Sequence, residues 1–195
     1  MLAATQSGAL SQAQPLAQTK GNLEKAYVGE TTACSKYQAY AQKARAEGKK
    51  GVASLFEAAS QAEAIHASNH ASVLATLGEA NPKSGAFSGK VGSTQANLKD
   101  AWRGETEEKD QMYPAMLTVA TSEKQVGAQR TFRFALAAER QHAALYSAAM
   151  TNLNSGKKDI GLKSFSVCQT CGATQQGNAP KACVTCKGTK FDKIK

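Results

Sequence analysis

The C-terminal part of the chain carries two Cys-x-x-Cys pairs, which together could hold one metal ion. The four cysteines are Cys168, Cys171, Cys183 and Cys186, with eleven residues between the two pairs. Two such pairs can direct four thiolates onto one ion in a tetrahedral arrangement. The spacing suits iron and zinc equally, and a zinc ribbon is one interpretation. Because the segment contains little apolar material, we expect it to need its metal in order to fold.

A second set of potential ligands repeats within the chain. Glu63 and His66 lie three residues apart, and Glu139 and His142 repeat this spacing. Residues at i and i+3 project from the same face of a helix, one turn apart. One Glu-x-x-His pair is weak evidence for a site, but two copies in equivalent helices can hold two metal ions. Carboxylate oxygens combined with imidazole nitrogens suit iron or manganese.

The two Glu-x-x-His pairs belong to a longer internal repeat. Residues 22–31 match residues 97–106 at six of ten positions, an offset of 75, and the segments around the two pairs recur at an offset of 76. Glu30 and Glu105 are therefore equivalent, and they add one carboxylate to each half. Because the flanking segments are apolar, these carboxylates should face the interior, where they need cations. Solvated helix charges that were simply duplicated are the alternative interpretation.

Three further side chains are placed to contribute to such a site. Glu108 breaks the repeat, since its counterpart is Ala33, and it would make the two metal positions unequal. An exposed charge in the acidic run of residues 105–110 is the alternative for Glu108. Tyr37 and Tyr113 lie about two turns beyond the first carboxylate of each half, where they could bond to ligands or pack in the core.

Other reactive residue types have plainer interpretations. His70 follows His66 by four residues, but its counterpart in the second half is Tyr146, so a solvated or packing histidine is the better interpretation. Cys34 is expected to be a small core residue. Pro114 lies deep inside a helix and should kink it near the carboxylates.

Four long helical segments must position these residues. They are predicted at about residues 19–47 and 50–77, from near Thr94 onward, and from Ser122 to just before Gly156. Ser122 and Gln125 have the spacing of a capping box at the start of the last helix. Residues 79–93 are rich in Gly, Ser, Asn and Pro and form a long connection. Two hairpins of long helices joined by one long crossover predict a mainly α fold, a four-helix bundle.

Length and charge fix the domain organisation and exclude several classes of protein. The 195 residues, with 24 Lys+Arg, 15 Asp+Glu and a net charge of +9, allow one ordinary domain and a small second one. We predict a flexible arm at 1–18, the bundle at 19–155 and a small metal-bound domain at 156–195. No apolar run is long enough to cross a membrane, and the first 19 residues lack the basic start of an export signal. We therefore expect a cytoplasmic protein whose basic surface is solvated rather than bound to nucleic acid or membrane.

Taken together, these motifs resemble the rubrerythrin family over about residues 19–190. The residues that carry the resemblance are Gly-Glu30, Glu63-x-x-His66, Gly-Glu105-x-x-Glu108 with Met112-Tyr113-Pro114, Glu139-x-x-His142 and the four cysteines. The resemblance implies a ferritin-like diiron four-helix bundle with one long crossover, followed by a rubredoxin-like domain with one iron. It does not extend to Ala173, where rubredoxins usually have an aromatic residue.

The resemblance also implies roles for individual residues. The implied iron ligands are Glu30, Glu63, Glu105, Glu108, Glu139 and His142, with Glu63 and Glu139 bridging an oxo-bridged iron pair. His66 would exchange with Glu108 on one iron as the oxidation state changes, which makes these two the implied catalytic residues. Tyr37 and Tyr113 would form hydrogen bonds near the irons.

The implied function is that of an NAD(P)H-linked non-haem peroxidase in oxidative-stress defence. The iron pair would reduce hydrogen peroxide to water, and the four-cysteine iron, with zinc as an alternative occupant, would relay electrons from a redox protein or reductase. A homodimer is implied, in which one subunit's rubredoxin-like centre lies near the other's iron pair. A ferritin-like ferroxidase that uses dioxygen is the main alternative, and a zinc-ribbon binding protein with structural metals in its bundle is a more distant one.

Overall fold

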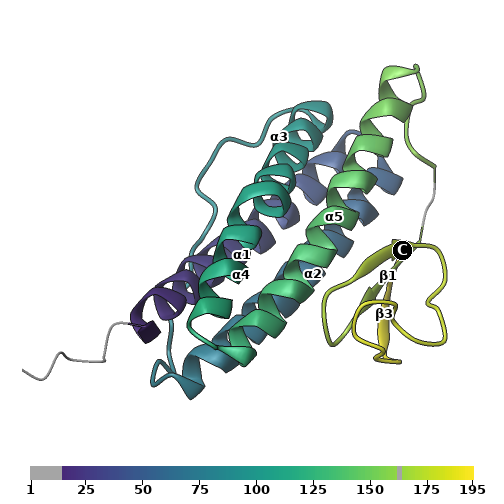
Figure 1. The fold of residues 1–195 in the computed structure, drawn as a ribbon. Coiled ribbons are helices and arrows are strands. Elements are labelled where there is room, and N and C mark those ends of the chain that lie inside the picture. The colour runs from purple at the N-terminus through teal and green to yellow at the C-terminus, as the bar shows by residue number, and fades with distance from the viewer. Residues whose placement is uncertain (1–14, 162–163) are drawn as a thin grey trace, which may run out of the picture.

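The computed structural model describes residues 15–161 and 164–195, which form a helical bundle with a small β-module beside it (Figure 1). The elements are α1 (Pro15–Ala46), α2 (Lys50–Thr76), α3 (Thr94–Glu107), a π-helical turn η1 (Glu108–Met112), α4 (Tyr113–Ser122), α5 (Val126–Asn154), β1 (Phe165–Cys168), β2 (Thr174–Gln176) and β3 (Phe191–Ile194). Because α3, η1 and α4 continue one another, they form one rod, and the bundle has four rods: α1, α2, α3–η1–α4 and α5. The predicted mainly α, ferritin-like fold class with a C-terminal four-cysteine module is confirmed.

The helices pair as two hairpins connected by the long crossover. α1 turns into α2 at Gly48, whose φ of +73° favours glycine. The crossover then lies along the outer face of α1, where the Gly85 N–H donates to Thr31 Oγ1 at 2.8 Å and the Phe87 N–H donates to Ser35 Oγ at 2.9 Å. At its end, the Ser93 hydroxyl accepts the Ala96 N–H and caps α3 near the predicted start.

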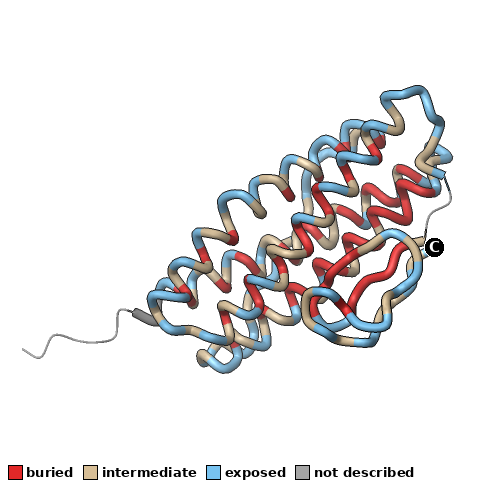
Figure 2. The backbone as a smooth tube through the Cα atoms, turned by 45° about the vertical axis from the view of Figure 1, so that its right-hand side comes forward, coloured by how far each residue is buried: buried red, intermediate tan, exposed pale blue. Residues whose placement is uncertain are grey.

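Two apolar clusters occupy the bundle core, one toward each end of the rods. One contains Tyr37, Phe56 and Tyr146, and the other contains Tyr113 and Phe132. Phe56 and Phe132 are equivalent positions of the repeat, and both are completely buried. Most of the remaining core positions are alanine, which lets the helices approach one another closely. Figure 2 shows buried stretches of the backbone, in red, along the helices and in the β-module.

The third rod contains a one-residue irregularity at η1. The Tyr113 N–H donates to the Glu108 carbonyl, five residues back instead of the usual four. Pro114 follows directly and has no N–H to continue a regular helix. The expected disturbance at this proline therefore takes the form of a π-turn. The extra residue in this turn also accounts for the change of the repeat offset from 75 to 76.

The predicted start of the last helix is wrong. α5 begins at Val126, and Ser122 instead ends α4, with its hydroxyl donating to the Val119 carbonyl at 2.8 Å. The chain turns at Lys124, whose φ is +56°, and the Gln125 side chain caps nothing. The capping-box spacing is present in the sequence, but the tight turn between α4 and α5 uses these residues.

The predicted N-terminal arm lies partly outside the described residues. α1 begins at Pro15, a residue type favoured in the first turn of a helix, so residues 15–18 of the arm are helical. Residues 1–14 lie outside the described part of the chain. Among the residues that the structure describes, no helix is both long and apolar enough to cross a membrane.

The β-module is a three-stranded antiparallel sheet in the order β2-β1-β3 that packs against α2 and α5. All of β1 is buried, and Phe165 and Val167 belong to the apolar cluster of the bundle. The linker is fixed to the start of α2, because Asp159 accepts the N–H groups of Gly51 at 2.8 Å and Val52 at 3.2 Å. The module and the bundle therefore share one core.

Candidate metal centres

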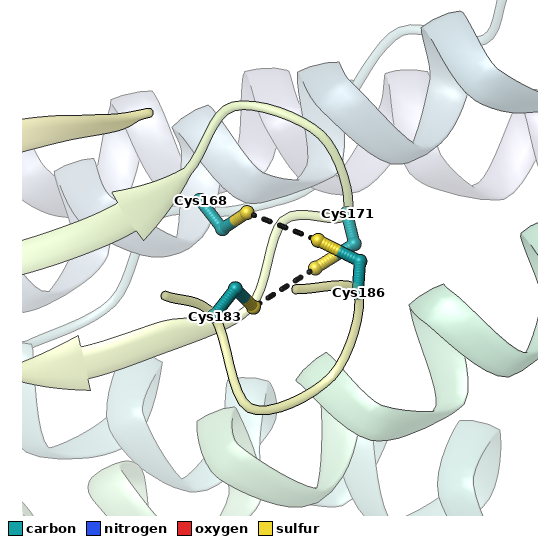
Figure 3. Close-up of side chains that lie close together, drawn as sticks. All are labelled: Cys168, Cys171, Cys183 and Cys186. Carbon is teal, nitrogen blue, oxygen red and sulfur yellow. Dashed lines mark hydrogen bonds between the residues drawn. The ribbon is translucent and has the colours of Figure 1, made fainter. Parts of the chain in front are cut away.

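The four cysteines lie together at the tip of the β-module (Figure 3). Cys168 Sγ lies 3.5 Å from Cys186 Sγ, and Cys171 Sγ lies 3.5 Å from Cys183 Sγ. These separations are too long for disulfides, and all four sulfurs can reach one ion. Burial raises the pKa of Cys183, but backbone N–H groups outweigh it and lower that pKa to about 7. Burial raises the pKa of Cys168 and of Cys171, so their thiols lose their protons when a metal ion replaces them. The four sulfurs can then hold one tetrahedral ion, as the spacing predicted.

Four carboxylates converge in the middle of the bundle, one from each rod. Glu30 comes from α1, Glu63 from α2, Glu105 from α3 and Glu139 from α5, and each is 2% exposed or less. In each carboxylate one oxygen has no hydrogen-bond partner among the described residues. A buried, unpaired carboxylate oxygen is costly unless a cation satisfies it. These side chains therefore fit metal ions, and the alternative of solvated helix charges is wrong.

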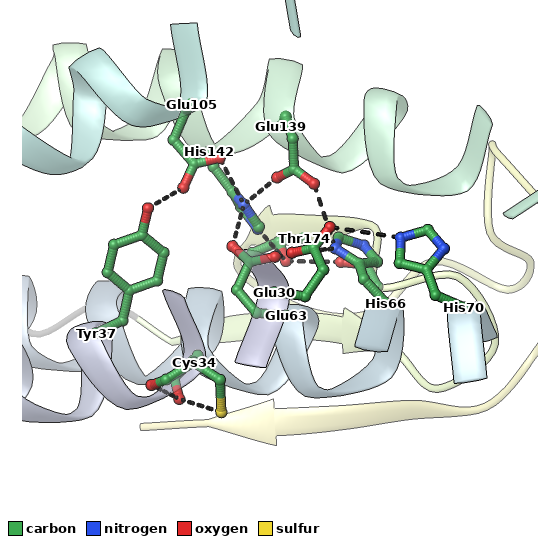
Figure 4. A network of polar contacts seen from close by, with 12 residues as sticks. Glu30, Cys34, Tyr37, Glu63, His66, His70, Glu105, Glu139, His142 and Thr174 are labelled. Carbon is green, nitrogen blue, oxygen red and sulfur yellow. Dashed lines mark hydrogen bonds and ion pairs between the residues drawn. The ribbon is translucent and has the colours of Figure 1, made fainter. Parts of the chain in front are cut away.

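The two histidines divide the carboxylates into two overlapping groups (Figure 4). His66 Nδ1 lies 2.9 Å from Glu63 Oε2 and 3.2 Å from Glu139 Oε1. His142 Nδ1 lies 3.0 Å from Glu139 Oε2 and 3.3 Å from Glu63 Oε1. One group is completed by Glu30 and the other by Glu105, and the ligand atoms of each lie within 4.8 Å of one another. Glu63 and Glu139 are common to both groups, so the arrangement can hold two adjacent ions.

The outer nitrogen of each histidine bonds to the β-module. The His66 Nε2–H donates to the Cys171 carbonyl at 3.3 Å. The His142 Nε2–H donates to Thr174 Oγ1 at 3.1 Å, because the Thr174 hydroxyl hydrogen is used on the Gly172 carbonyl. With its proton on Nε2, a neutral imidazole presents the Nδ1 lone pair to the carboxylates. Docking of the module thus holds both rings in the form that binds metal.

The electrostatics of the cluster show that it suits cations. Burial raises the pKa of Glu63 and of Glu139, and the neighbouring carboxylates raise both further. Burial lowers the pKa of His66 and His142, but the carboxylates around them outweigh it and raise both pKa values well above the ordinary value. In the absence of metal, protons on these groups therefore take the place of the cations.

The two tyrosines lie where the repeat placed them. The Tyr37 hydroxyl donates to Glu105 Oε1, and the Tyr113 hydroxyl donates to Glu30 Oε1. Burial raises the pKa of both phenols well above 10, and the nearby carboxylates raise it further. Each tyrosine therefore remains protonated and donates to the carboxylate of the opposite hairpin. The alternative, that they serve only in core packing, is wrong.

Glu108 lies at the outer edge of the cluster. It begins η1, is partly exposed, and is not one of the residues in the two four-ligand groups. It lines a surface cavity of about 380 Å³ together with Lys25 and Gln111. Burial of its carboxyl group and the charges of the inner carboxylates raise the pKa of Glu108 well above the ordinary value. Glu108 thus lines the cavity and also lies near enough to the inner carboxylates to be affected by their charges.

Sequence reasoning did not assign His70 to the site, although it allowed a packing role beside a solvated one. His70 is completely buried rather than solvated, and burial lowers its pKa. Its Nε2 lies 3.2 Å from the Tyr113 hydroxyl and 3.6 Å from Glu30 Oε1. The i+4 spacing from His66 was the available signal, but its counterpart Tyr146 argued against it. Cys34, expected in the core, is only partly buried.

Comparisons with known proteins agree with this arrangement. The family model described as Rubrerythrin matches residues 21–150. Rubrerythrin-2 of Clostridium acetobutylicum is 35% identical over 179 residues, covering 91% of this chain and 96% of that protein. Nigerythrin of Nitratidesulfovibrio vulgaris is 33% identical over 168 residues, covering 86% of this chain and 81% of that protein.

Solved structures give the same result at the level of the fold. Nigerythrin in its fully reduced, all-ferrous state has a TM-score of 0.83 and 31% identity, covering 100% of this chain and 92% of that one. A bacterioferritin from Desulfovibrio desulfuricans, at 18% identity and a TM-score of 0.60, shares the fold alone. The bundle thus holds a diiron site of carboxylates and histidines, and the four cysteines hold one further metal. This chain belongs to the rubrerythrin family.

Proposed function

We propose that this protein is a non-haem diiron peroxidase that reduces hydrogen peroxide to water in defence against oxidative stress. The observation that carries the proposal is the double contact of His66. Its Nδ1 faces the carboxylates, and its Nε2–H donates to the carbonyl of Cys171, one of the four cysteines. One side chain therefore connects a two-electron site with a one-electron site. That connection suits a peroxidase that is re-reduced one electron at a time.

The residues that would hold the irons follow from the two groups. Glu30, Glu63, Glu139 and His66 would hold one iron, and Glu63, Glu105, Glu139 and His142 would hold the other. Glu63 and Glu139 would bridge the pair. When bound, the iron pair supplies the two electrons that convert hydrogen peroxide and two protons into two molecules of water, and the four-cysteine iron returns those electrons singly.

Glu108 and His66 would act on opposite sides of this pair. Glu108 lines the surface cavity beside η1 and is placed to meet incoming peroxide and to hold a proton there. His66 faces the β-module on the other side. This separation supports the exchange that we propose, in which Glu108 binds one iron in the oxidised state and His66 binds it in the reduced state.

The charge of the C-terminal segment supports a proposal for the electron donor. Residues 156–195 contain eight basic and two acidic side chains, which suits an acidic redox protein as the immediate donor, supplied in turn from NAD(P)H. The resemblance implies a relay between subunits, but the module lies against the carboxylate cluster of its own chain, so we propose instead a relay within one chain. We also propose a cytoplasmic homodimer. A reduction rate that does not change with salt would argue against the charge-guided donor.

Stopped-flow mixing of the fully reduced holoprotein with peroxide or dioxygen tests the proposal. We expect peroxide to oxidise the iron pair faster than dioxygen does. Faster oxidation by dioxygen would instead indicate a ferroxidase or iron-handling protein. Metal analysis with an absorption spectrum checks the relay, and zinc alone in the four-cysteine site, without visible Fe(Cys)4 bands, would eliminate it.

A further inference from the structure

A chain of buried hydrogen bonds connects α5 and α2 to one end of the carboxylate cluster. Thr131 Oγ1 lies 3.0 Å from His70 Nδ1, and His70 Nε2 lies 3.2 Å from the Tyr113 hydroxyl. The Tyr113 hydroxyl in turn contacts Glu30 Oε1. All four side chains are 3% exposed or less. Figure 4 shows His70 beside His66 on the same helix.

The direction of each bond follows from the available protons. The Tyr113 hydroxyl has one hydrogen, and it is donated to Glu30. The Tyr113 oxygen must therefore accept the Nε2–H of His70. Nδ1 of the neutral ring then carries a lone pair and accepts the Thr131 hydroxyl hydrogen. Every donor in the chain Thr131–His70–Tyr113 thus points toward Glu30.

The other end of the cluster lacks such a chain. There Tyr37 donates to Glu105, but the residue in the position equivalent to His70 is Tyr146. The Tyr146 hydroxyl packs near Tyr37, with ring centroids 5.7 Å apart, and has no hydrogen-bond partner among the described residues. The hydroxyl that donates to Glu30 therefore accepts a hydrogen bond from His70, which accepts one from Thr131. Among the described residues, the hydroxyl that donates to Glu105 accepts no such hydrogen bond.

Hydrogen bonds in a chain polarise one another, so a donor that is itself an acceptor binds more strongly. A stronger hydrogen bond to a ligating carboxylate withdraws negative charge from it and tunes the metal that it binds. We propose that His70 is a positioning residue that makes the two iron positions unequal by strengthening the bond from Tyr113 to Glu30. The iron beside Glu30 then holds its reduced state more strongly than the iron beside Glu105. This inference rests on the iron pair of the proposed function and not on its substrate.

The test measures the half-oxidised state. Holoprotein reduced anaerobically is titrated with ferricyanide, and the mixed-valent iron pair is quantified by electron paramagnetic resonance, separately from the signal of the four-cysteine iron. We expect His70→Phe to lower the maximum mixed-valent yield about threefold or more, the effect of a fraction of one charge-assisted hydrogen bond. His70→Gln, which has one donor and one acceptor, should retain most of the yield.

Tyr146→Phe is the matched control, since it removes an unpartnered hydroxyl at the equivalent position and should leave the yield unchanged. If His70→Phe does not fold, Thr131→Val tests the same chain from its outer end and should lower the yield in the same direction. An unchanged yield in the folded His70→Phe or Thr131→Val variant, with two irons still bound in the bundle, would overturn the inference. A protein that forms the mixed-valent state but does not turn over peroxide would refute the proposed function alone.

Discussion

The two histidines of the cluster have both ring nitrogens engaged. In His66 and His142 the outer nitrogen bonds to the β-module and the inner nitrogen faces carboxylates. Protons and metal ions therefore compete for the same nitrogen. Because the carboxylates raise the pKa of both rings, this competition extends above the ordinary histidine range.

This competition predicts opposite pH dependences for the metal-free and metal-bound protein. Without metal, the raised histidine pKa values stabilise the fold below about pH 6.5, and this contribution is lost as the pH rises through the higher folded-state values. With metal bound, lowering the pH returns protons to the nitrogens and expels the ion. We expect the increase in melting temperature caused by Co²⁺ to shrink as the pH falls from about 8 to 6. Thermal unfolding with and without Co²⁺ at each pH measures this increase. An increase that does not depend on pH would contradict the competition of protons and metal for the same histidine nitrogen.

Glu108 and its neighbour Glu107 form a matched pair for testing the outer carboxylate. Glu108→Ala should leave two irons in the bundle, because the inner four glutamates remain, but should slow peroxide turnover about a hundredfold, a typical contribution of a positioned acid or base. Glu107→Ala should have little effect, since Glu107 is exposed. Iron content and steady-state rates provide the measurement. Equal rates in the two variants would refute the role of Glu108.

At this scale, spacing predicted the inner residues well and the supporting ones poorly. The Glu-x-x-His pairs and the cysteines are readable because one helical turn or one knuckle fixes their mutual geometry. The spacing left His70 undecided between a solvated and a packing residue, because its contacts are with Tyr113 and Thr131, which come from two other helices. No local pattern records a contact between rods.

Among the elements, η1 is where the second half of the duplicated bundle differs from the first. Glu30 precedes Tyr37 by seven residues within a regular helix, whereas Glu105 precedes Tyr113 by eight across the π-turn. The extra residue lets both tyrosines reach equivalent positions. The change of the repeat offset from 75 to 76 indicates an inserted residue. The sequence alone did not show whether this residue lies in a loop or in a helix.

Deletion of Lys109 should convert η1 into regular α-helix. The spacing from Glu105 to Tyr113 would then equal that of the first half, so we expect a folded protein that retains both contacts of the tyrosines. Deletion of Lys99 is the control, because it takes the buried Leu98 out of register with Glu105 without removing any irregularity. Circular dichroism and thermal unfolding compare the two. If both deletions destabilise the protein equally, η1 is not the site of the insertion.

Over the whole molecule, the decisive contact is that between the β-module and the bundle. Gly172 has a φ of +73°, and a Cβ placed there would lie 2.7 Å from His66 Cδ2 and 3.2 Å from the Ala62 carbonyl. The module can therefore approach α2 this closely only because residue 172 is a glycine and has no side chain. The repeat and the motifs predicted both parts of the molecule, but not this docking, which depends on how the surfaces of the two parts fit together.

Gly172→Ala should separate the module from the cluster. Gly177 has a φ of +94°, and a Cβ placed there would have no atom within 4 Å, so Gly177→Ala introduces the backbone strain alone. Both variants should lose about 1–2 kcal/mol from this strain, but only Gly172→Ala should slow re-reduction of the iron pair, by about tenfold or more. Rapid-mixing spectroscopy of both centres measures the transfer. Equal transfer rates would show that the His66 contact is not used.

The π-turn has a consequence for the history of this molecule. A duplicated hairpin alone would produce two interchangeable metal positions with no distinction between the sides of the bundle. The π-turn and the substitution that puts Glu108 opposite Ala33 end that equivalence, because Glu108 lies at one edge of the cluster and the β-module lies at the other. One residue of extra length and one substitution thus distinguish the face that carries the surface cavity from the face that carries the β-module.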